Sequence, residues 1–402
     1  MPSPPLYDCF TGTSLFAINR TGSTAKTGSF LTRAVPHFAS FPVPAHDEQD
    51  RRFEAAFRIL EDAIAALAFP AASLAVTHDG KLLALRAFGH FTYDTSSRQA
   101  APDTLFDLAS VTKAVATTTM AMILYQRGLL DLEMPVISVV GEFAGEDPRR
   151  DEVTLRMLLA HSSGLPAYEK LFLRARTREE LLAGAYSTPL ANEPGSHAEY
   201  SDIGFITLGV ALERLADESL DRFCQREILG PLGMTHTTFN PAPDLRSTIP
   251  PTADDETFRH RIIQGEVQDE NTNILGGVAG HAGLFATAQD VATFAHVLLQ
   301  GGNPILRPET IALFTKRESS PEGTSRALGW DTPSSPSQSG QYFSLNSYGH
   351  LGYTGTSLWI DPVRNLSITL LTNRTWPDCK NQAIKQVRPR FHDAVMEVLS
   401  QK

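Results

Sequence analysis

The chain has 402 residues, 42% hydrophobic and 20% charged, which is typical of a globular protein with a large core. Its formal net charge of -10 argues against nucleic acid or an anionic membrane surface as a partner, and no apolar run approaches the ~20 residues of a membrane span. Cys9, Cys224 and Cys379 are far apart and in no CxxC pair, which favours a reducing compartment and predicts neither a disulfide framework nor a structural zinc site.

The N-terminal region differs in composition from the rest of the chain. Residues 1–45 are rich in Ser, Thr, Pro and Gly and lack the apolar segment of a secretory signal, so we expect a flexible arm on a cytoplasmic protein. A wrongly assigned start would hide a leader. Residues 46–402 are expected to form one domain, with a sheet region at about 46–108 and 320–402 and a helical region at about 109–319.

The first elements indicate a helix followed by an antiparallel hairpin. Residues 47–68 place apolar side chains three and four apart on one face, which predicts an amphipathic helix. These side chains are Phe53, Phe57, Leu60, Ile64 and Leu67. Two short apolar runs around Asp79-Gly80 then predict a tight hairpin.

The middle and the end of the chain suggest how the elements combine. Ser110 to about Arg127 has hardly a charge after Lys113, which is typical of a helix buried on all sides. TSLWIDP and NLSITLLTN predict two strands around a turn at 362–364, and a last helix is expected over roughly 381–400. We therefore expect an α+β fold, in which both ends of the chain build one antiparallel sheet flanked by terminal helices, beside a mostly helical lobe.

Ser110-Val111-Thr112-Lys113 is the main candidate for chemistry. Residues three apart share a helix face, so the lysine amine can reach the serine hydroxyl. Burial lowers a lysine pKa, and a neutral lysine can take the serine proton. A second copy, Ser23-Thr24-Ala25-Lys26, overlaps a Lys26-Thr27-Gly28 tripeptide, but it lies in a polar stretch with no core helix behind it. We therefore select the copy at Ser110.

Three further segments are candidate parts of the same site. Tyr200-Ser201-Asp202 precedes an apolar helical run, so Tyr200 is either a proton shuttle or a packing residue beside a helix cap. The segment from His350 to Gly355 precedes a strand, and the backbone N–H of Tyr353 is a candidate oxyanion donor with that of Ser110, although a Gly-rich hairpin with a bystander His fits equally.

His281 lies in a Gly- and Ala-rich segment and either lines a pocket or is a structural residue. His161, before Ser162-Ser163-Gly164, is interpreted as structural. No G-x-S-x-G elbow and no H-E-x-x-H motif occurs, so neither an α/β-hydrolase nor a zinc protease is supported, and no metal or cofactor is expected.

Taken in order, these motifs resemble the serine β-lactamase-like family, which includes class C β-lactamases, penicillin-binding proteins and related esterases. The resemblance extends over roughly residues 55–400 and includes VTLRMLLAHSSGLP and ILGPLGMTHTTF. It implies a β-lactamase/transpeptidase-like fold, with Ser110 as the acylated nucleophile, Lys113 as its base and Tyr200 as the proton shuttle.

The resemblance also assigns places around the substrate. His350 stands where the family has the lysine of its Lys-Thr-Gly motif, Gly352 stands at that motif's glycine, and Tyr353 supplies an oxyanion N–H. Asp202 replaces the asparagine of the usual Tyr-x-Asn. An ionised Asp202 would keep Lys113 charged, so either Asp202 is protonated or turned aside, or Tyr200 acts as base. A neutral imidazole at His350 attracts anions less than an ammonium, and both departures count against an efficient penicillinase.

Within the family, the segment 251–285 is most similar to cytoplasmic N-acetylmuramyl-L-alanine amidases of muropeptide recycling. The expected function is hydrolysis of an ester or amide in a small or peptide-like substrate. The alternatives are a short-chain carboxylesterase, a D-Ala carboxypeptidase or weak β-lactamase, and a catalytically silent ligand-binding protein of the same fold. The sequence does not predict the oligomeric state.

Overall fold

The computed structural model describes residues 42–400. The Ser-x-x-Lys copy at 23–26 and residues 1–41 of the predicted N-terminal arm lie outside the described residues. Residues 42–45 of that arm are the first ones that the structure describes. Within 42–400, none of the helices has both the length and the apolar character needed to cross a membrane.

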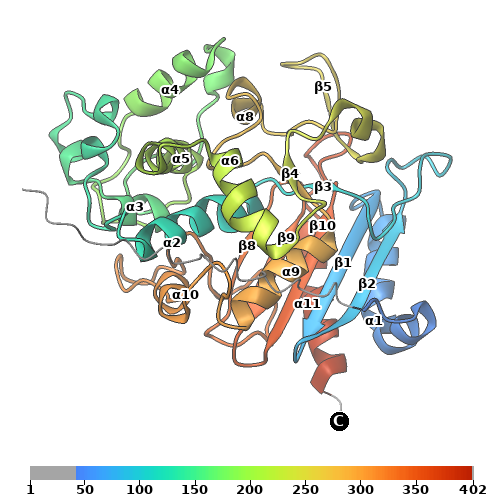
Figure 1. The fold of residues 1–402 in the computed structure, drawn as a ribbon. Helices are drawn as coiled ribbons and strands as arrows, with labels where there is room; N and C mark the ends of the chain where they lie inside the picture. Colours follow the sequence, from blue (N-terminus) through green and yellow to red (C-terminus); the bar gives the residue numbers. More distant parts are fainter. Residues whose placement is uncertain (1–41, 401–402) are drawn as a thin grey trace, which may run out of the picture. The chain divides into compact units, whose positions relative to one another are not determined.

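The largest sheet has five antiparallel strands in the order β2-β1-β10-β9-β8, so it is built from both ends of the described chain (Figure 1). Its strands are β1 (Ala71–His78), β2 (Lys81–Gly89), β8 (Tyr348–Leu351), β9 (Ser357–Asp361) and β10 (Leu366–Thr372). The predicted hairpin joins β1 to β2. Asp79 and Gly80 both have positive φ, at 47° and 75°, as a tight turn between right-twisted strands requires.

Both faces of this sheet are covered by helices, so consecutive residues along one strand pack into different hydrophobic cores. Leu74 and Leu370 are paired across β1 and β10 and belong to the core beneath the two terminal helices. Ala75 and Leu371, the next residues, belong to the core on the opposite face. The covering helices are α1 (His46–Ala65) and α11 (Ile384–Ser400) on one face and α9 (Ala288–Leu299) on the other (Figure 1). The expected α+β fold with terminal helices on one sheet is confirmed.

Helix α1 differs from its prediction only at its end. Phe53, Phe57 and Leu60 are buried as expected, but the helix ends at Ala65. Leu67 lies beyond it with a φ of 58°, and the residue is 56% exposed, so the prediction that placed it on the apolar face was wrong. The backbone turns into β1 there, which moves Leu67 off the helix face.

The middle of the chain is mostly helical but also holds short strands that the sequence did not predict. Its helices are α2 (Thr119–Gln126), α3 (Leu155–Leu159), α4 (Arg178–Ser187), α5 (Asp202–Ala216), α6 (Leu220–Cys224), α7 (Gly230–Leu232), α8 (Glu270–Ile274) and α10 (Pro308–Thr315). Its strands form a three-stranded sheet of β3 (Phe106–Asp107), β7 (Leu284–Ala286) and β4 (Thr238–Phe239), and a hairpin of β5 (Pro251–Asp255) and β6 (Arg261–Gln264).

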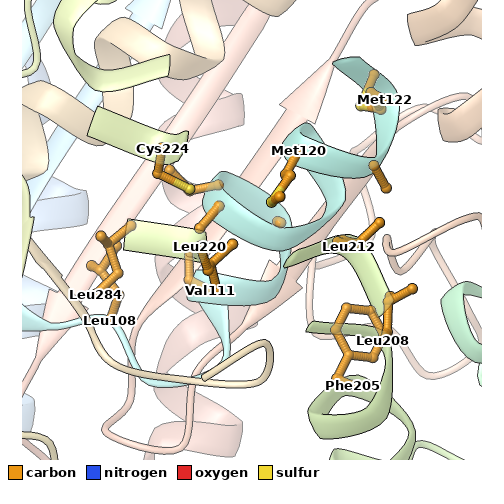
Figure 2. Close-up of a cluster of buried hydrophobic side chains, with 14 of the residues drawn as sticks. Leu108, Val111, Met120, Met122, Phe205, Leu208, Leu212, Leu220, Cys224 and Leu284 are labelled. Carbon is orange, nitrogen blue, oxygen red and sulfur yellow. The ribbon is translucent and has the colours of Figure 1, made fainter. Parts of the chain in front are cut away.

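The predicted buried helix follows directly after Ser110. It is π-helical over Lys113–Thr118 and continues as α2. Helix α2 packs against α5 and α6, and Met120, Leu212 and Leu220 lie in the core between them (Figure 2). Because neighbours enclose it, this helix holds the residues at its start in a fixed place.

Candidate active site

Ser110 is presented by a constrained turn between β3 and the buried helix. The preceding residue, Ala109, has a φ of 45°, which is unusual for a residue with a side chain. The carboxyl of Asp107 accepts hydrogen bonds from the backbone N–H of Ala109, at 2.8 Å, and of Gln268, at 2.7 Å. Burial raises the pKa of Asp107 to about 6, although these two hydrogen bonds oppose the shift. This buried carboxyl therefore fixes the turn that exposes the serine.

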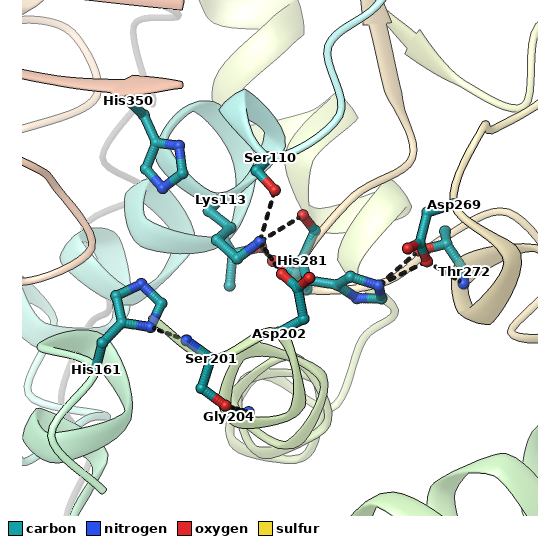
Figure 3. Close-up of polar contacts among 12 residues, drawn as sticks. Ser110, Lys113, His161, Ser201, Asp202, Gly204, Asp269, Thr272, His281 and His350 are labelled. Carbon is teal, nitrogen blue, oxygen red and sulfur yellow. Dashed lines mark hydrogen bonds and ion pairs between the residues drawn. The ribbon is translucent and has the colours of Figure 1, made fainter. Parts of the chain in front are cut away.

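Lys113 lies directly beneath Ser110 and is fully buried. Its Nζ is 3.0 Å from the Oγ of Ser110, 2.6 Å from Oδ1 of Asp202 and 3.0 Å from the backbone oxygen of His281 (Figure 3). The ammonium also lies 4.8 Å from the centre of the Tyr200 ring. The sequence left open that Asp202 is turned away from Lys113. The structure shows instead that its carboxyl contacts the lysine.

The charge of Lys113 follows from these contacts. Burial lowers the pKa of Lys113, but the carboxylate of Asp202 and the nearby Tyr200 outweigh burial, so the net pKa lies above that of a free lysine. Burial has the opposite effect on the Tyr200 phenol: it raises the pKa of Tyr200, although the nearby Lys113 ammonium opposes this rise. The arrangement favours a charged lysine beside a neutral phenol.

Tyr200 is held in place from the start of helix α5. Ser201 caps this helix, since its Oγ accepts the N–H of Gly204 at 3.0 Å; the predicted helix cap is therefore present, and it leaves Tyr200 available for a chemical role. The ring of His161 packs against that of Tyr200 with 4.6 Å between ring centres. The Nδ1 of His161 accepts the N–H of Ser201 at 3.0 Å (Figure 3). His161 therefore positions Tyr200, consistent with its interpretation as structural.

The segment after β8 is fastened to the segment before Ser110. Thr356 donates from its Oγ1 to the carbonyl of Leu108 at 2.8 Å. A Cβ on Gly352 would lie 2.5 Å from that same carbonyl oxygen and 1.9 Å from Oγ1 of Thr356, so only glycine fits there. Neither Tyr353 nor Ser110 donates its backbone N–H to an acceptor within residues 42–400. The close approach leaves two free N–H groups on neighbouring segments.

His350 is buried at the end of the same strand. Its Nδ1 lies 2.8 Å from the carbonyl of Leu351, which makes Nδ1 the protonated nitrogen. Burial, together with the positive charges of Lys113 and Arg326, lowers the pKa of His350 to about 3. The imidazole is neutral at physiological pH.

His281 contributes a backbone contact and a fixed ring. Its carbonyl accepts a hydrogen bond from Lys113, and its Nε2 lies 2.8 Å from Oδ1 of Asp269 and 3.0 Å from Oγ1 of Thr272 (Figure 3). Burial raises the pKa of Asp269, but the charge of His281 and the hydrogen bonds reverse this and hold it well below its usual range. His281 therefore braces the site.

One cavity of ≈ 750 Å³ joins these groups, and its size suits a small organic ligand. The candidate residues that line it are Ser110, Tyr200, Asp202, His281, His350, Gly352 and Tyr353, whereas Lys113 lies beneath its wall. The sequence reasoning missed the cationic lining residues Arg326, Arg374 and Arg388, because isolated arginines carry no spacing signal. Among residues 42–400, no three His, Cys, Asp or Glu side chains are grouped so that they could hold a metal ion.

Comparisons with known proteins identify the family of this chain. The family model described as beta-lactamase matches residues 57–387. A putative D-alanyl-D-alanine carboxypeptidase of Escherichia coli strain K12 is 31% identical over 398 residues, covering 90% of this chain and 89% of that protein.

Solved structures share the fold. EstCE1, a hydrolase with promiscuous acyltransferase activity, has a TM-score of 0.71 at 20% identity and covers 87% of this chain and 98% of its own. A penicillin-binding protein homolog from Caulobacter crescentus has a TM-score of 0.71 at 19% identity and covers 89% of this chain and 99% of its own. At these identities the two structures indicate a common fold alone.

Proposed function

The chain belongs to the beta-lactamase family and is a serine hydrolase, and on this basis we propose that it cleaves an ester or amide bond through an acyl-enzyme formed on Ser110. The observation that carries the proposal is the 3.0 Å contact between the Oγ of Ser110 and the Nζ of buried Lys113. A nucleophile within hydrogen-bond reach of a base that is itself oriented by a third group is the arrangement that covalent catalysis needs. Asp202 is that third group.

The proton path in this proposal begins with the Lys113–Asp202 pair. Lys113 is charged in the resting site and must lose a proton before it can act as a base. Lys113 loses this proton to solvent, against the carboxylate of Asp202 at 2.6 Å, which favours the charged lysine. Neutral Lys113 then takes the proton of Ser110 as its Oγ attacks the substrate carbonyl carbon.

Tyr200 acts as a proton donor in this scheme. Its raised pKa keeps the phenol protonated, which suits donation to the leaving oxygen or nitrogen and counts against a role as base. A water molecule then attacks the acyl-enzyme carbonyl and gives a proton to the Tyr200 phenolate, which restores the phenol, and Lys113 returns its proton to the Oγ of Ser110 as the acid product departs.

The free backbone N–H groups of Ser110 and Tyr353 would stabilise the negative oxygen of the tetrahedral intermediate. Preorganised donors in a water-poor site are among the strongest contributions to acyl transfer. Gly352 and Thr356 hold the two segments close enough for this role, which makes them positioning residues.

The substrate that we propose is an amide or ester in a small peptide-like molecule. The similarity of the segment 251–285 to N-acetylmuramyl-L-alanine amidases favours a MurNAc–L-Ala amide, and hence cell-wall recycling in the cytoplasm. A reducing compartment also fits Cys224 and Cys379, both of which are free thiols.

A second candidate is D-Ala carboxypeptidase activity. It is supported by the Escherichia coli relative, which is named a putative D-alanyl-D-alanine carboxypeptidase. Neutral His350 counts against it, since a carboxylate-ending substrate gains less from an uncharged imidazole than from a lysine. The release of L-Ala from MurNAc-L-Ala against the release of D-Ala from a D-Ala-D-Ala peptide separates the two candidates.

Mass spectrometry of the intact protein tests the acyl-enzyme. Incubation with a fluorophosphonate should add one adduct to the wild type and none to Ser110→Ala. Ser23→Ala, in the other Ser-x-x-Lys copy, is the matched control and should label like the wild type. An adduct that persists in Ser110→Ala, or a wild type that no acylating or phosphonylating agent labels, would refute the proposal.

A further inference from the structure

Two cations lie close to the ring of Tyr200. The Nζ of Lys113 is 4.8 Å from the ring centre, and the guanidinium carbon of Arg326 is 5.4 Å from it. Both distances are within the range over which a cation is attracted to the face of an aromatic ring. Lys113 is the base of the proposed mechanism, whereas Arg326, which lines the same cavity as Ser110, has no role in it.

The guanidinium of Arg326 has only a loose counter-charge. Its Nη1 lies 3.7 Å from Oδ1 of Asp331, which is too far for a hydrogen bond. That carboxylate oxygen instead accepts hydrogen bonds from the Oγ of Ser325, at 2.9 Å, and from the backbone N–H of Thr332, at 3.1 Å. No guanidinium nitrogen of Arg326 donates a hydrogen bond within residues 42–400. The positive charge of Arg326 is therefore weakly offset at the cavity wall.

A tight turn before β8 holds Arg326 in this place. The backbone N–H of Ala327, the next residue, donates to the carbonyl of Trp330 at 2.9 Å. Asp331, directly after the turn, exchanges two backbone hydrogen bonds of 2.8 and 2.9 Å with Gly349 of β8. The turn is therefore fastened to the main sheet beside the strand that carries the rest of the site.

The imidazoles around Tyr200 carry no charge that could take the place of Arg326. The ring centres of His161 and His350 lie 4.6 and 6.1 Å from that of Tyr200. Burial lowers the pKa of His161 well below its usual value, and the charge of Arg326 lowers it further. Burial and the charges of Lys113 and Arg326 lower the pKa of His350 to about 3. Both imidazoles are therefore neutral at physiological pH.

The proposed role of Tyr200 creates a negative charge in this place. When its hydroxyl proton passes to the leaving oxygen or nitrogen, the bond from that atom to the acyl carbon breaks and a phenolate remains. Burial disfavours the phenolate, because it raises the pKa of Tyr200. The ammonium of Lys113 opposes this, but the carboxylate of Asp202 at 2.6 Å offsets much of its charge. Arg326 is the second cation beside the ring, and its own carboxylate contact is longer.

From these observations we infer that Arg326 stabilises the phenolate that Tyr200 becomes when it protonates the leaving group. Arg326 acts through Tyr200 and is therefore a positioning residue. The inference rests on the proposed function and deepens it, because it assigns the substrate class: esters and amides whose leaving groups are too basic to depart without a proton. The proton that water later gives to the phenolate restores the phenol, so the same guanidinium serves each turnover.

A series of aryl acetates tests this role with the acyl group unchanged. The leaving phenol becomes more basic from p-nitrophenyl through m-nitrophenyl and p-chlorophenyl to phenyl acetate, so the need for a proton donor rises along the series. Relative to the wild type, Arg326→Met should lose less than about threefold in kcat/KM with p-nitrophenyl acetate and at least about tenfold with phenyl acetate. Arg326→Lys keeps the charge and should stay close to the wild type with both esters.

Two controls separate this role from a structural one. Arg98 lies 5.7 Å from the centre of the Phe91 ring, a similar contact outside the cavity, so Arg98→Met should follow the wild type along the whole series. A double-mutant cycle shows whether Arg326 acts through Tyr200. In a Tyr200→Phe background, Arg326→Met should cause no further loss in the release of phenol from phenyl acetate.

The dependence on the leaving group decides the outcome. An equal loss in Arg326→Met with all four esters would mean that Arg326 binds the substrate or supports the fold, and it would overturn the inference. An undiminished effect of Arg326→Met in the Tyr200→Phe background would overturn it as well. If Arg326→Met does not fold, Arg326→Gln is put through the same comparison. A wild type that releases no phenol from any of the four esters would instead overturn the proposed function itself.

Discussion

Replacing Asp202 with asparagine should shift the pH dependence of the enzyme to lower pH. In the wild type, Asp202 holds the pKa of Lys113 above that of a free lysine although burial pulls it down. Asparagine keeps the shape of the side chain and removes the charge. Burial then dominates, the pKa of Lys113 falls, and more of the lysine is neutral and able to accept the Ser110 proton at neutral pH.

The size of the shift follows from the geometry of the pair. At 2.6 Å and an effective dielectric constant of about 20, Coulomb's law gives an attraction of roughly 6 kcal/mol, which is an upper limit. Breaking a buried ion pair by removing one partner costs about 3–5 kcal/mol, or about 2–4 pKa units at 1.36 kcal/mol per unit. The Asp202 side chain is 18% exposed, so we expect a shift of about 2 units.

The assay is kcat/KM for p-nitrophenyl acetate as a function of pH, which reports the essential groups of the free enzyme. The rising limb of Asp202→Asn should lie about 2 pH units below that of the wild type. Asp290→Asn is the control, since it removes a buried carboxyl that binds Thr237 instead of Lys113, and its limb should stay in place. A folded Asp202→Asn whose limb does not move, or moves to higher pH, would refute the assignment of Lys113 as the base.

Two further predictions concern the oxyanion segment and acid stability. Gly352→Ala should reduce kcat by about 10²-fold, because the new Cβ would collide with the Leu108 carbonyl and displace an oxyanion donor. The control Gly141→Ala has open space around its Cβ and should keep a kcat within about twofold of the wild type. Equal activities of the two variants would contradict this prediction. Burial lowers the pKa of His392 to about 3, below its unfolded value near 6.5, so its contribution to stability is complete above pH 6.5 and declines as the pH falls toward 3. Between pH 6.5 and 4.5, protonation of His392 should account for about 2–3 kcal/mol of the decrease in the free energy of unfolding measured in urea. His392→Phe should abolish this part of the decrease, and the control His236→Gln, at an exposed site, should retain it. An unchanged loss in His392→Phe would show that His392 is not responsible.

The sequence by itself determined the features that depend on neighbouring residues. The helix beginning near residue 46 follows from its apolar periodicity, and the β1–β2 hairpin follows from Asp79-Gly80, two residues that tolerate positive φ. The contact between Ser110 and Lys113 follows from their spacing of three across the start of one helix, and the charge-free run behind them explains why that helix is buried. In each case the signal and the structure lie within a few turns of the chain.

Only the tertiary structure decided which distant groups meet at Ser110 and in what state of charge. The motif order placed Tyr200 and His350 in one site by resemblance, but their burial, which raises the pKa of one and lowers that of the other, depends on the walls of the cavity. The direction of Asp202 toward Lys113 could not be read from a Tyr-Ser-Asp tripeptide, since the two residues are 89 positions apart. Arg374 and Arg388 line one cavity because α11 packs on the sheet that contains β10. Long-range packing sets burial and electrostatics together, and no local pattern of residues encodes either of them.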